Sequence, residues 1–354
     1  KWTLTAMALV WALVQLPFLF AASLPLLMAN RIILGAGEGP AYPVALHAAY
    51  KWFPNERRPL PSSVIAVGGA VGLGLCAPAI IYVIGHYSWH VAFGGLGVLG
   101  LIWVWAWAVI GREGPLTATS GLLANQPQRL SYWRLLTCRT AIGCFVVGFF
   151  AYWLLVLDFV WLPNYLRTGP GFSPTEVGWV FTLPPLAQIV LVPAINAWSQ
   201  KMKKDDMSSR RSRGFVGAGA VLVAGLFTFL LPLAHSPVST IVCVTFAFSI
   251  GTVIFSLGHV MIAEVTPPAQ RGAMLGINNA IVTMAGIFAP YVMGKMVDVG
   301  ASTAQGFRSG FMIAGVLVMV GAIVGLILIN PEADLLRFAR VGGGARPLPR
   351  TQAG

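Results

Sequence analysis

The stretch NRIILGAGEGPAYP at residues 30–43 places two charged side chains, Arg31 and Glu38, inside an apolar run long enough to cross a lipid bilayer. Seven residues make two helical turns, so both side chains project from one face of a helix, roughly 10 Å apart at about 1.5 Å per residue. Ionisable groups at such depth are costly, and they usually face a partner, a cavity or an ion path. The stretch therefore predicts a membrane-spanning helix with a functional site at Arg31 and Glu38.

The composition of the chain agrees with a membrane fold. Of its 354 residues, 57% are hydrophobic and 10% are charged, against roughly 25% charged residues in an average soluble domain. The net charge of +12 would suggest nucleic acid in a soluble protein, but the basic residues gather in short gaps between apolar runs, which is a topology signal. The four cysteines have no paired or zinc-like spacing. We expect no metal, no cofactor and no nucleic-acid partner.

Ten apolar segments are long enough to span a bilayer at roughly 20 residues each. They are long continuous runs rather than short alternating ones, which argues against a barrel and predicts an all-α polytopic membrane bundle. The segments cover residues 3–24, 26–50, 61–84, 90–110, 140–163, 175–198, 214–234, 238–263, 272–295 and 309–330.

Lysine and arginine gather in every second loop, and the positive-inside rule assigns these loops to the cytoplasm. The start of the chain and its C-terminal tail are then both cytoplasmic. The longest polar stretch divides the chain into four segments and six. We expect part of a first helical bundle at 1–111, a cytoplasmic loop at 112–139, a six-helix bundle at 140–331 and a cytoplasmic tail at 332–354. A six-plus-six architecture without its first two helices would have this pattern.

Several motifs resemble the anion:cation symporter family of the major facilitator superfamily, which includes carriers of sugar acids, phthalate, sialic acid and glutamate. The resemblance covers residues 2–331 and implies a major-facilitator-type bundle that transports an organic anion. The motifs are R-x-x-L-G-x-G-E-G-x-x-x-P at 31–43, WFPNER at 52–57, the stretch 68–78, WHVAF at 89–93, WLPNY at 161–165, S-x-x-E-x-G at 173–178 and the stretch 278–294.

The resemblance also implies roles for the two buried charges. Arg31 would bind the anionic substrate, and Glu38 would couple its movement to protons. A substrate carboxylate bound to Arg31 through a fork of hydrogen bonds would compete with Glu38 for that charge. This predicts proton-coupled symport of a sugar acid or an aromatic carboxylate by alternating access around a midplane site. A structural ion pair between helices is the alternative for these residues, and sodium coupling and anion exchange also stay open.

Five further polar residues are candidates for the substrate pocket. Tyr42 lies one turn beyond the glutamate and can either hydrogen-bond to it or pack. Asp158 is a candidate substrate gate or second proton site, or a carboxylate that reaches the outer interface. Asn278 and Asn279 lie inside an apolar helix, where amides bind a substrate or link helices. Ser256 lies in the preceding helix.

The sequence has no Gly-x-Ser-x-Gly elbow, His-Glu-x-x-His pair or Walker A loop, which argues against an enzyme and against an ATP-driven pump. Energy would then come from an ion gradient. We expect a monomeric, multi-pass protein of a bacterial cytoplasmic (inner) membrane. The rival hypothesis is a truncated, non-transporting scaffold or sensor, because ten helices cannot form two matched six-helix halves.

Overall fold

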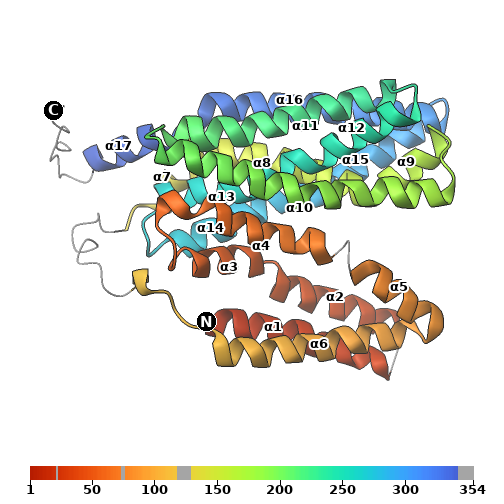
Figure 1. The fold of residues 1–354 in the computed structure, drawn as a ribbon, viewed down its shortest axis with the longest axis horizontal. Coiled ribbons are helices and arrows are strands. Elements are labelled where there is room, and N and C mark those ends of the chain that lie inside the picture. Colours follow the sequence, from red (N-terminus) through yellow and green to blue (C-terminus); the bar gives the residue numbers. More distant parts are fainter. Residues whose placement is uncertain (21–22, 73–75, 118–128, 342–354) are drawn as a thin grey trace.

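The computed structural model describes residues 1–20, 23–72, 76–117 and 129–341, and every regular element within them is helical (Figure 1). The all-α membrane bundle predicted from the sequence is therefore confirmed. The first half contains α1 (Trp2–Gln15), η1 (Leu16–Leu19), α2 (Leu24–Glu38), α3 (Ala41–Ala49), η2 (Asn55–Arg57), α4 (Pro59–Val71), α5 (Ala77–His86) and α6 (Trp89–Ile110). The second half contains α7 (Tyr132–Leu136), α8 (Arg139–Val160), α9 (Leu162–Thr168), α10 (Pro174–Lys204), η6 (Arg210–Phe215), α11 (Val216–Leu230), α12 (Pro237–Ser249), η8 (Ile250–Thr252), α13 (Val253–Val265), α14 (Arg271–Thr283), α15 (Ala285–Val299), α16 (Thr303–Leu328) and α17 (Pro331–Val341).

The expected loop and the expected tail each lie partly outside the described residues. The residues not described are 118–128 in the loop and 342–354 in the tail. Within the described part of the tail, the chain forms the helix α17. Figure 1 places α17, α7 and the start of α1 at the same end of the molecule.

Eight helical segments of the described chain are long and apolar enough to cross a membrane. The other two predicted spans are not among these eight segments. The span 26–50 is divided into α2 and α3, and the span 61–84 contains α4 and α5 on either side of 73–75, which lie outside the described residues. The first division has a direct cause. Pro43 has no N–H, so the Gly39 carbonyl loses its helical donor, and Pro40 removes another donor at the same place. The expected continuous helix at 26–50 is therefore two shorter helices that meet at Gly39 and Pro40.

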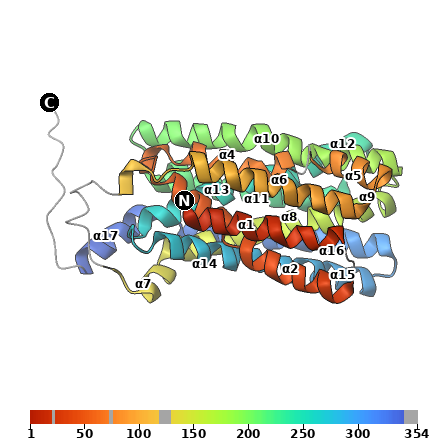
Figure 2. The same cartoon turned by 90° about the horizontal axis from the view of Figure 1, so that it is seen from below.

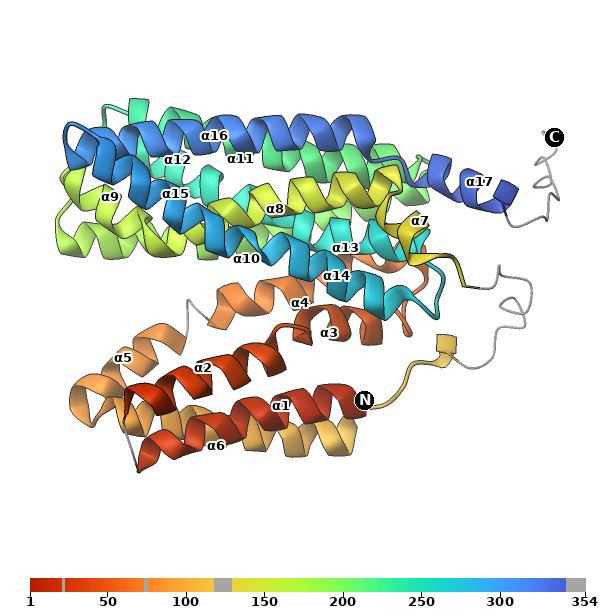
Figure 3. The ribbon, with the colours of Figure 1, turned by 180° about the vertical axis from the view of Figure 1, so that it is seen from behind.

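The first-half helices lie along one side of the second-half bundle (Figures 1 and 3). In the first half, α1 packs against α6 and α2, and Figure 2 shows these three helices in front of the second half. The helices α3 and α4 make the contact between halves, because α3 packs on α14 and α4 packs on α10 and α13. This contact brings the end of α2 close to α8 and α14.

One end of the contact between the halves is fastened by a buried arginine. The Arg213 guanidinium, with a side chain 0% exposed, donates from Nη1 to Glu264 Oε2 at 2.6 Å. It also donates to Asn55 in the first half, to Oδ1 at 3.0 Å and to the backbone oxygen at 2.6 Å. Ser209 Oγ donates to Glu264 Oε1 at 2.7 Å. A buried charge pair is tolerated when it gains further hydrogen bonds, and these bonds tie η2 to η6 and α13. Arg213 Nε has no partner among the described residues.

The helices α11 and α16 approach each other closely because α16 presents glycine to its neighbour. A Cβ atom built on Gly315 would lie 2.5 Å from the backbone nitrogen of Phe229. No rotation of a side chain can relieve such an overlap, so the two helices would have to move apart.

We expect Gly315→Ala to lower the free energy of unfolding by about 1–3 kcal/mol through this overpacking. The control is Gly219→Ala on α11, where an added Cβ meets no atom within 4 Å. The measurement is thermal stability of the purified protein in detergent. Equal stability of the two variants would contradict the tight contact between α11 and α16.

Candidate functional site

A polar cleft opens between the halves beside the break that separates α2 from α3. Its volume is about 800 Å³. Glu38 ends α2 and lines the cleft with an exposed carboxyl group, and across from it lie Tyr152 of α8 and Asn279 of α14. The full lining is Gly35, Ala36, Glu38, Gly39, Pro40, Tyr152, Gly276, Asn279, Ala280 and Thr283.

The cleft is bridged by a hydrogen bond that depends on the prolines of α3. Asn279 Nδ2 donates to the carbonyl oxygen of Gly39 at 3.1 Å. In an uninterrupted helix the residue four positions later would donate to this oxygen, but that residue is Pro43. The carbonyl that the first half leaves without its helical donor is thus bonded by an amide of the second half.

A second polar network lies deeper between the halves. Tyr42 Oη of α3 donates to the backbone oxygen of Phe255 in α13 at 3.1 Å. His259 Nδ1 lies 2.6 Å from the same oxygen, and a carbonyl accepts only, so Nδ1 carries the proton. His259 Nε2 can then accept from Asn278 Nδ2 at 3.2 Å. The Tyr42 ring meets the imidazole edge to face, with ring centroids 5.2 Å apart.

This network separates the two predicted asparagines. Asn278 faces His259 inside the second half, whereas Asn279 faces the cleft and the first half. Tyr42 bonds to α13 rather than to the carboxyl group of Glu38. Of the five further candidates, only Asn279 lines the cleft itself.

Arg31 and Glu38 are not paired in this conformation. The Arg31 guanidinium carbon lies 5.5 Å from the ring centroid of Phe93 in α6. That ring belongs to an aromatic cluster with Phe18 and Trp89, at centroid distances of 5.1 and 5.8 Å. The three salt bridges of the described residues include neither Arg31 nor Glu38. The two side chains therefore leave the same helix toward different neighbours.

Asp158 and Ser256 lie away from the cleft. Asp158 is 1% exposed, and neither of its carboxyl oxygens has a hydrogen-bond partner in the described part of the chain. Ser256 is buried, and its hydroxyl lies 2.9 Å from both Asn196 Oδ1 and the backbone oxygen of Val253. Both residues lie on helices, as the sequence predicted, but the sequence did not show that both are buried.

Three residues at the contact were not predicted as site residues. Tyr152 and Thr283 line the cleft, and His259 sits at the centre of the deeper network. Tyr152 and Thr283 carry no sequence signal beyond a polar group in an apolar helix.

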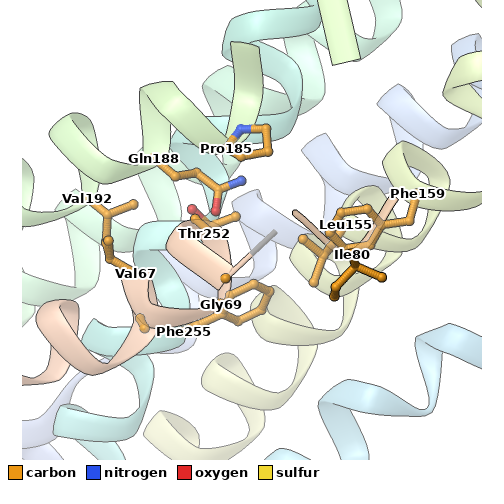
Figure 4. Close-up of a pocket in the computed structure, with 13 residues that line it drawn as sticks. Val67, Gly69, Ile80, Leu155, Phe159, Pro185, Gln188, Val192, Thr252 and Phe255 are labelled. Atoms are coloured by element: carbon orange, nitrogen blue, oxygen red, sulfur yellow. The ribbon is translucent and has the colours of Figure 1, made fainter. Parts of the chain in front are cut away.

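A second cavity of about 490 Å³ lies between the halves, with Phe255 among its lining residues (Figure 4). Its polar side chains are Gln188 and Thr252, which lie side by side on one wall. The full lining is Ala66, Val67, Gly69, Ala70, Gly72, Ile80, Leu155, Phe159, Pro185, Gln188, Val192, Thr252 and Phe255.

Long apolar helices around polar groups at the contact of two halves define a multi-pass helical membrane protein. The chain belongs to the Major Facilitator Superfamily, whose family model matches residues 1–251 and 158–351.

Curated relatives cover most of the chain at low identity. A probable sulfoacetate transporter of Cupriavidus necator is 27% identical over 94% of this chain and 78% of its own length. A D-galactonate transporter of Escherichia coli is 25% identical over 90% of this chain and 78% of its own length. Among solved structures, the human organic anion transporter MFSD10 has a TM-score of 0.67 at 14% identity, covering 91% of this chain and 76% of that one. The last likeness shows the fold.

Proposed function

We propose that this protein is a secondary active carrier that moves an organic anion together with protons. The observation that carries the proposal is Glu38, an exposed carboxyl group that lines the cleft between the halves of a membrane-spanning bundle. Ionisable side chains in such positions are typical of substrate and proton pathways. The names of the relatives, which include sulfoacetate, D-galactonate and other anion transporters, support an organic anion as the substrate.

The proposed coupling follows from the sign of the charges. An anion bound about 6 Å from an ionised Glu38, at an effective dielectric constant of about 20, would be repelled by about 3 kcal/mol. That energy corresponds to roughly a hundredfold loss of affinity. A proton on Glu38 removes the repulsion, so the anion and the proton bind together and leave together.

Arg31 supplies the positive charge in this proposal. Its stacking on Phe93 is worth about 0.5–1 kcal/mol at an exposed site, which is less than a forked pair of hydrogen bonds to a carboxylate provides. The guanidinium would therefore turn from Phe93 to the bound anion. Asn279 is the proposed second ligand, with Tyr42 and Asn278 holding the neighbouring helices in position.

Transport by this route requires the halves to rock around the cleft. The Asn279 bond to Gly39 and the Arg213 bonds to Asn55 link the two halves, so both sets would break and re-form in each cycle. The alternation of basic loops supports a cytoplasmic C-terminus, and the bacterial relatives support a bacterial inner membrane.

The test is uptake of labelled sulfoacetate, D-galactonate and 4-toluenesulfonate into proteoliposomes that contain the purified chain. We expect an inward proton gradient to drive accumulation of at least one anion, and a protonophore to abolish it. If only a sodium gradient drives accumulation, the coupling ion is sodium and not the proton. Flux that needs a counter-anion inside would identify an exchanger. No flux under any gradient would favour the scaffold or sensor alternative.

A further inference from the structure

The second cavity differs from the Glu38 cleft in its chemistry. No charged side chain is present among its described lining residues, and its walls are mainly aliphatic and aromatic. Figure 4 shows Leu155, Ile80 and Phe159 grouped at one end, away from Gln188 and Thr252. A volume of about 490 Å³ is within the roughly 300–1,000 Å³ of small-molecule pockets. The cavity is therefore suited to an uncharged, largely apolar body.

The hydrogen-bonding capacity of this cavity is small. Gln188 uses one N–H on the backbone oxygen of Phe248 at 3.1 Å, and Thr252 donates its hydroxyl to the backbone oxygen of Ser249 at 2.6 Å. Among the side chains of the described lining residues, one amide N–H, the amide oxygen and the threonine oxygen remain for a ligand. A body with several hydroxyl groups would leave some of them unpaired, and each unpaired buried hydroxyl lowers affinity by about tenfold.

The cavity adjoins the cleft through a pair of aromatic rings. Phe255 lines the cavity and Tyr152 lines the Glu38 cleft. Their ring centroids are 6.1 Å apart in an edge-to-face arrangement, so the two side chains form the wall between the compartments. Tyr42 bonds to the backbone of Phe255, which links this wall to the first half. A movement of the halves would therefore act on the wall directly.

We propose, resting on the proposed function above, that the preferred substrate is an anion with a compact apolar body, such as an aromatic or branched aliphatic carboxylate or sulfonate. The charged group lies in the Glu38 cleft, and the apolar part of the substrate occupies the apolar cavity once movement of the halves has parted the Tyr152 and Phe255 rings. Gln188 and Thr252 accommodate one polar substituent on that body. Polyhydroxylated sugar acids are disfavoured, because the cavity cannot pair their hydroxyl groups.

The test compares proton-driven uptake of 4-toluenesulfonate and D-galactonate into proteoliposomes. Both anions carry a single charge, but the uncharged part is aromatic in the first and polyhydroxylated in the second. We expect 4-toluenesulfonate to enter at least about tenfold faster. Faster uptake of D-galactonate would overturn this inference and leave proton-coupled anion transport intact. Uptake of neither anion would overturn this inference, whereas the sulfoacetate arm of the uptake test decides the proposed function.

A pair of neighbouring glycines provides a matched variant and control. Gly69 lines the cavity, Gly68 does not, and a Cβ atom on either meets no atom within 4 Å. We expect Gly69→Leu to lower 4-toluenesulfonate uptake at least about tenfold by filling the cavity, and Gly68→Leu to leave it near the original rate. A second variant, Phe159→Asn, changes a lining side chain that is 45% exposed and should reduce the preference for the apolar anion. Unchanged preference in both cavity variants would overturn the inference.

Discussion

Glu38→Gln should abolish at least nine-tenths of proton-driven anion accumulation while leaving exchange of external for internal anion close to the original rate. Glutamine keeps the size and hydrogen-bonding atoms of the side chain but cannot take up or release a proton. Because Glu38 lines the cleft with an exposed carboxyl group, the substitution leaves no buried group without a partner. It should therefore remove coupling and spare the fold. The measurement is uptake into proteoliposomes with a proton gradient, and with unlabelled anion inside and no gradient.

The control for this variant is Glu56→Gln. Glu56 is also exposed, but it lies in η2 and outside the cleft lining. The Glu56→Gln variant should accumulate anion as the unmodified chain does. Full gradient-driven accumulation by the Glu38 variant would show that another group carries the proton. Loss of both accumulation and exchange would instead place Glu38 in substrate binding.

Arg213→Met should destabilise the protein by about 3–5 kcal/mol, the cost of leaving a buried charge without its partner. The partner is Glu264, whose side chain is 8% exposed. The same substitution also removes the donors that hold Asn55 of the first half. We expect a large drop in the temperature at which the purified protein loses its monodisperse elution in detergent.

Two further variants separate charge from packing at this cluster. Arg211→Met changes an exposed arginine of the same segment and should alter stability by less than about 0.5 kcal/mol. The double variant Arg213→Met, Glu264→Leu removes both charges and should recover part of the lost stability. If the double variant is as unstable as the single one, packing rather than the unpaired carboxylate dominates.

Much of the fold could be predicted from the sequence because lipid leaves few alternatives. A chain in a bilayer must satisfy its backbone internally, so a long apolar run such as 303–328 has to be a helix. The interruption at Pro40 was harder to place, because proline is tolerated inside many membrane helices. Its position depends on which partner takes the freed carbonyl of Gly39, and that partner, Asn279, is 240 residues away.

The residue types of the candidate site could be predicted from the sequence, but the direction in which each side chain points could not. The spacing of Arg31 and Glu38 defines their helix, yet the partner of each side chain depends on neighbouring helices. Asn278 and Asn279 are adjacent in sequence, and a turn of about 100° between successive helical residues sends them to different partners. Asp158 shows the same limit, because periodicity does not tell which helix covers a given face.

The hydrogen bond to the Gly39 carbonyl affects how easily the two halves move past each other during transport. This bond, donated by Asn279, lies in an open, polar cleft, so water or the hydroxyl and amine groups of a solute can replace the amide without loss of a hydrogen bond. When the Asn279 bond breaks during movement of the halves, the Gly39 carbonyl therefore gains another donor and is not left without a hydrogen bond. Water or solute in the cleft therefore lowers the energetic cost of the movement. A cleft emptied of water, or filled by an apolar inhibitor, would hold the protein in one conformation.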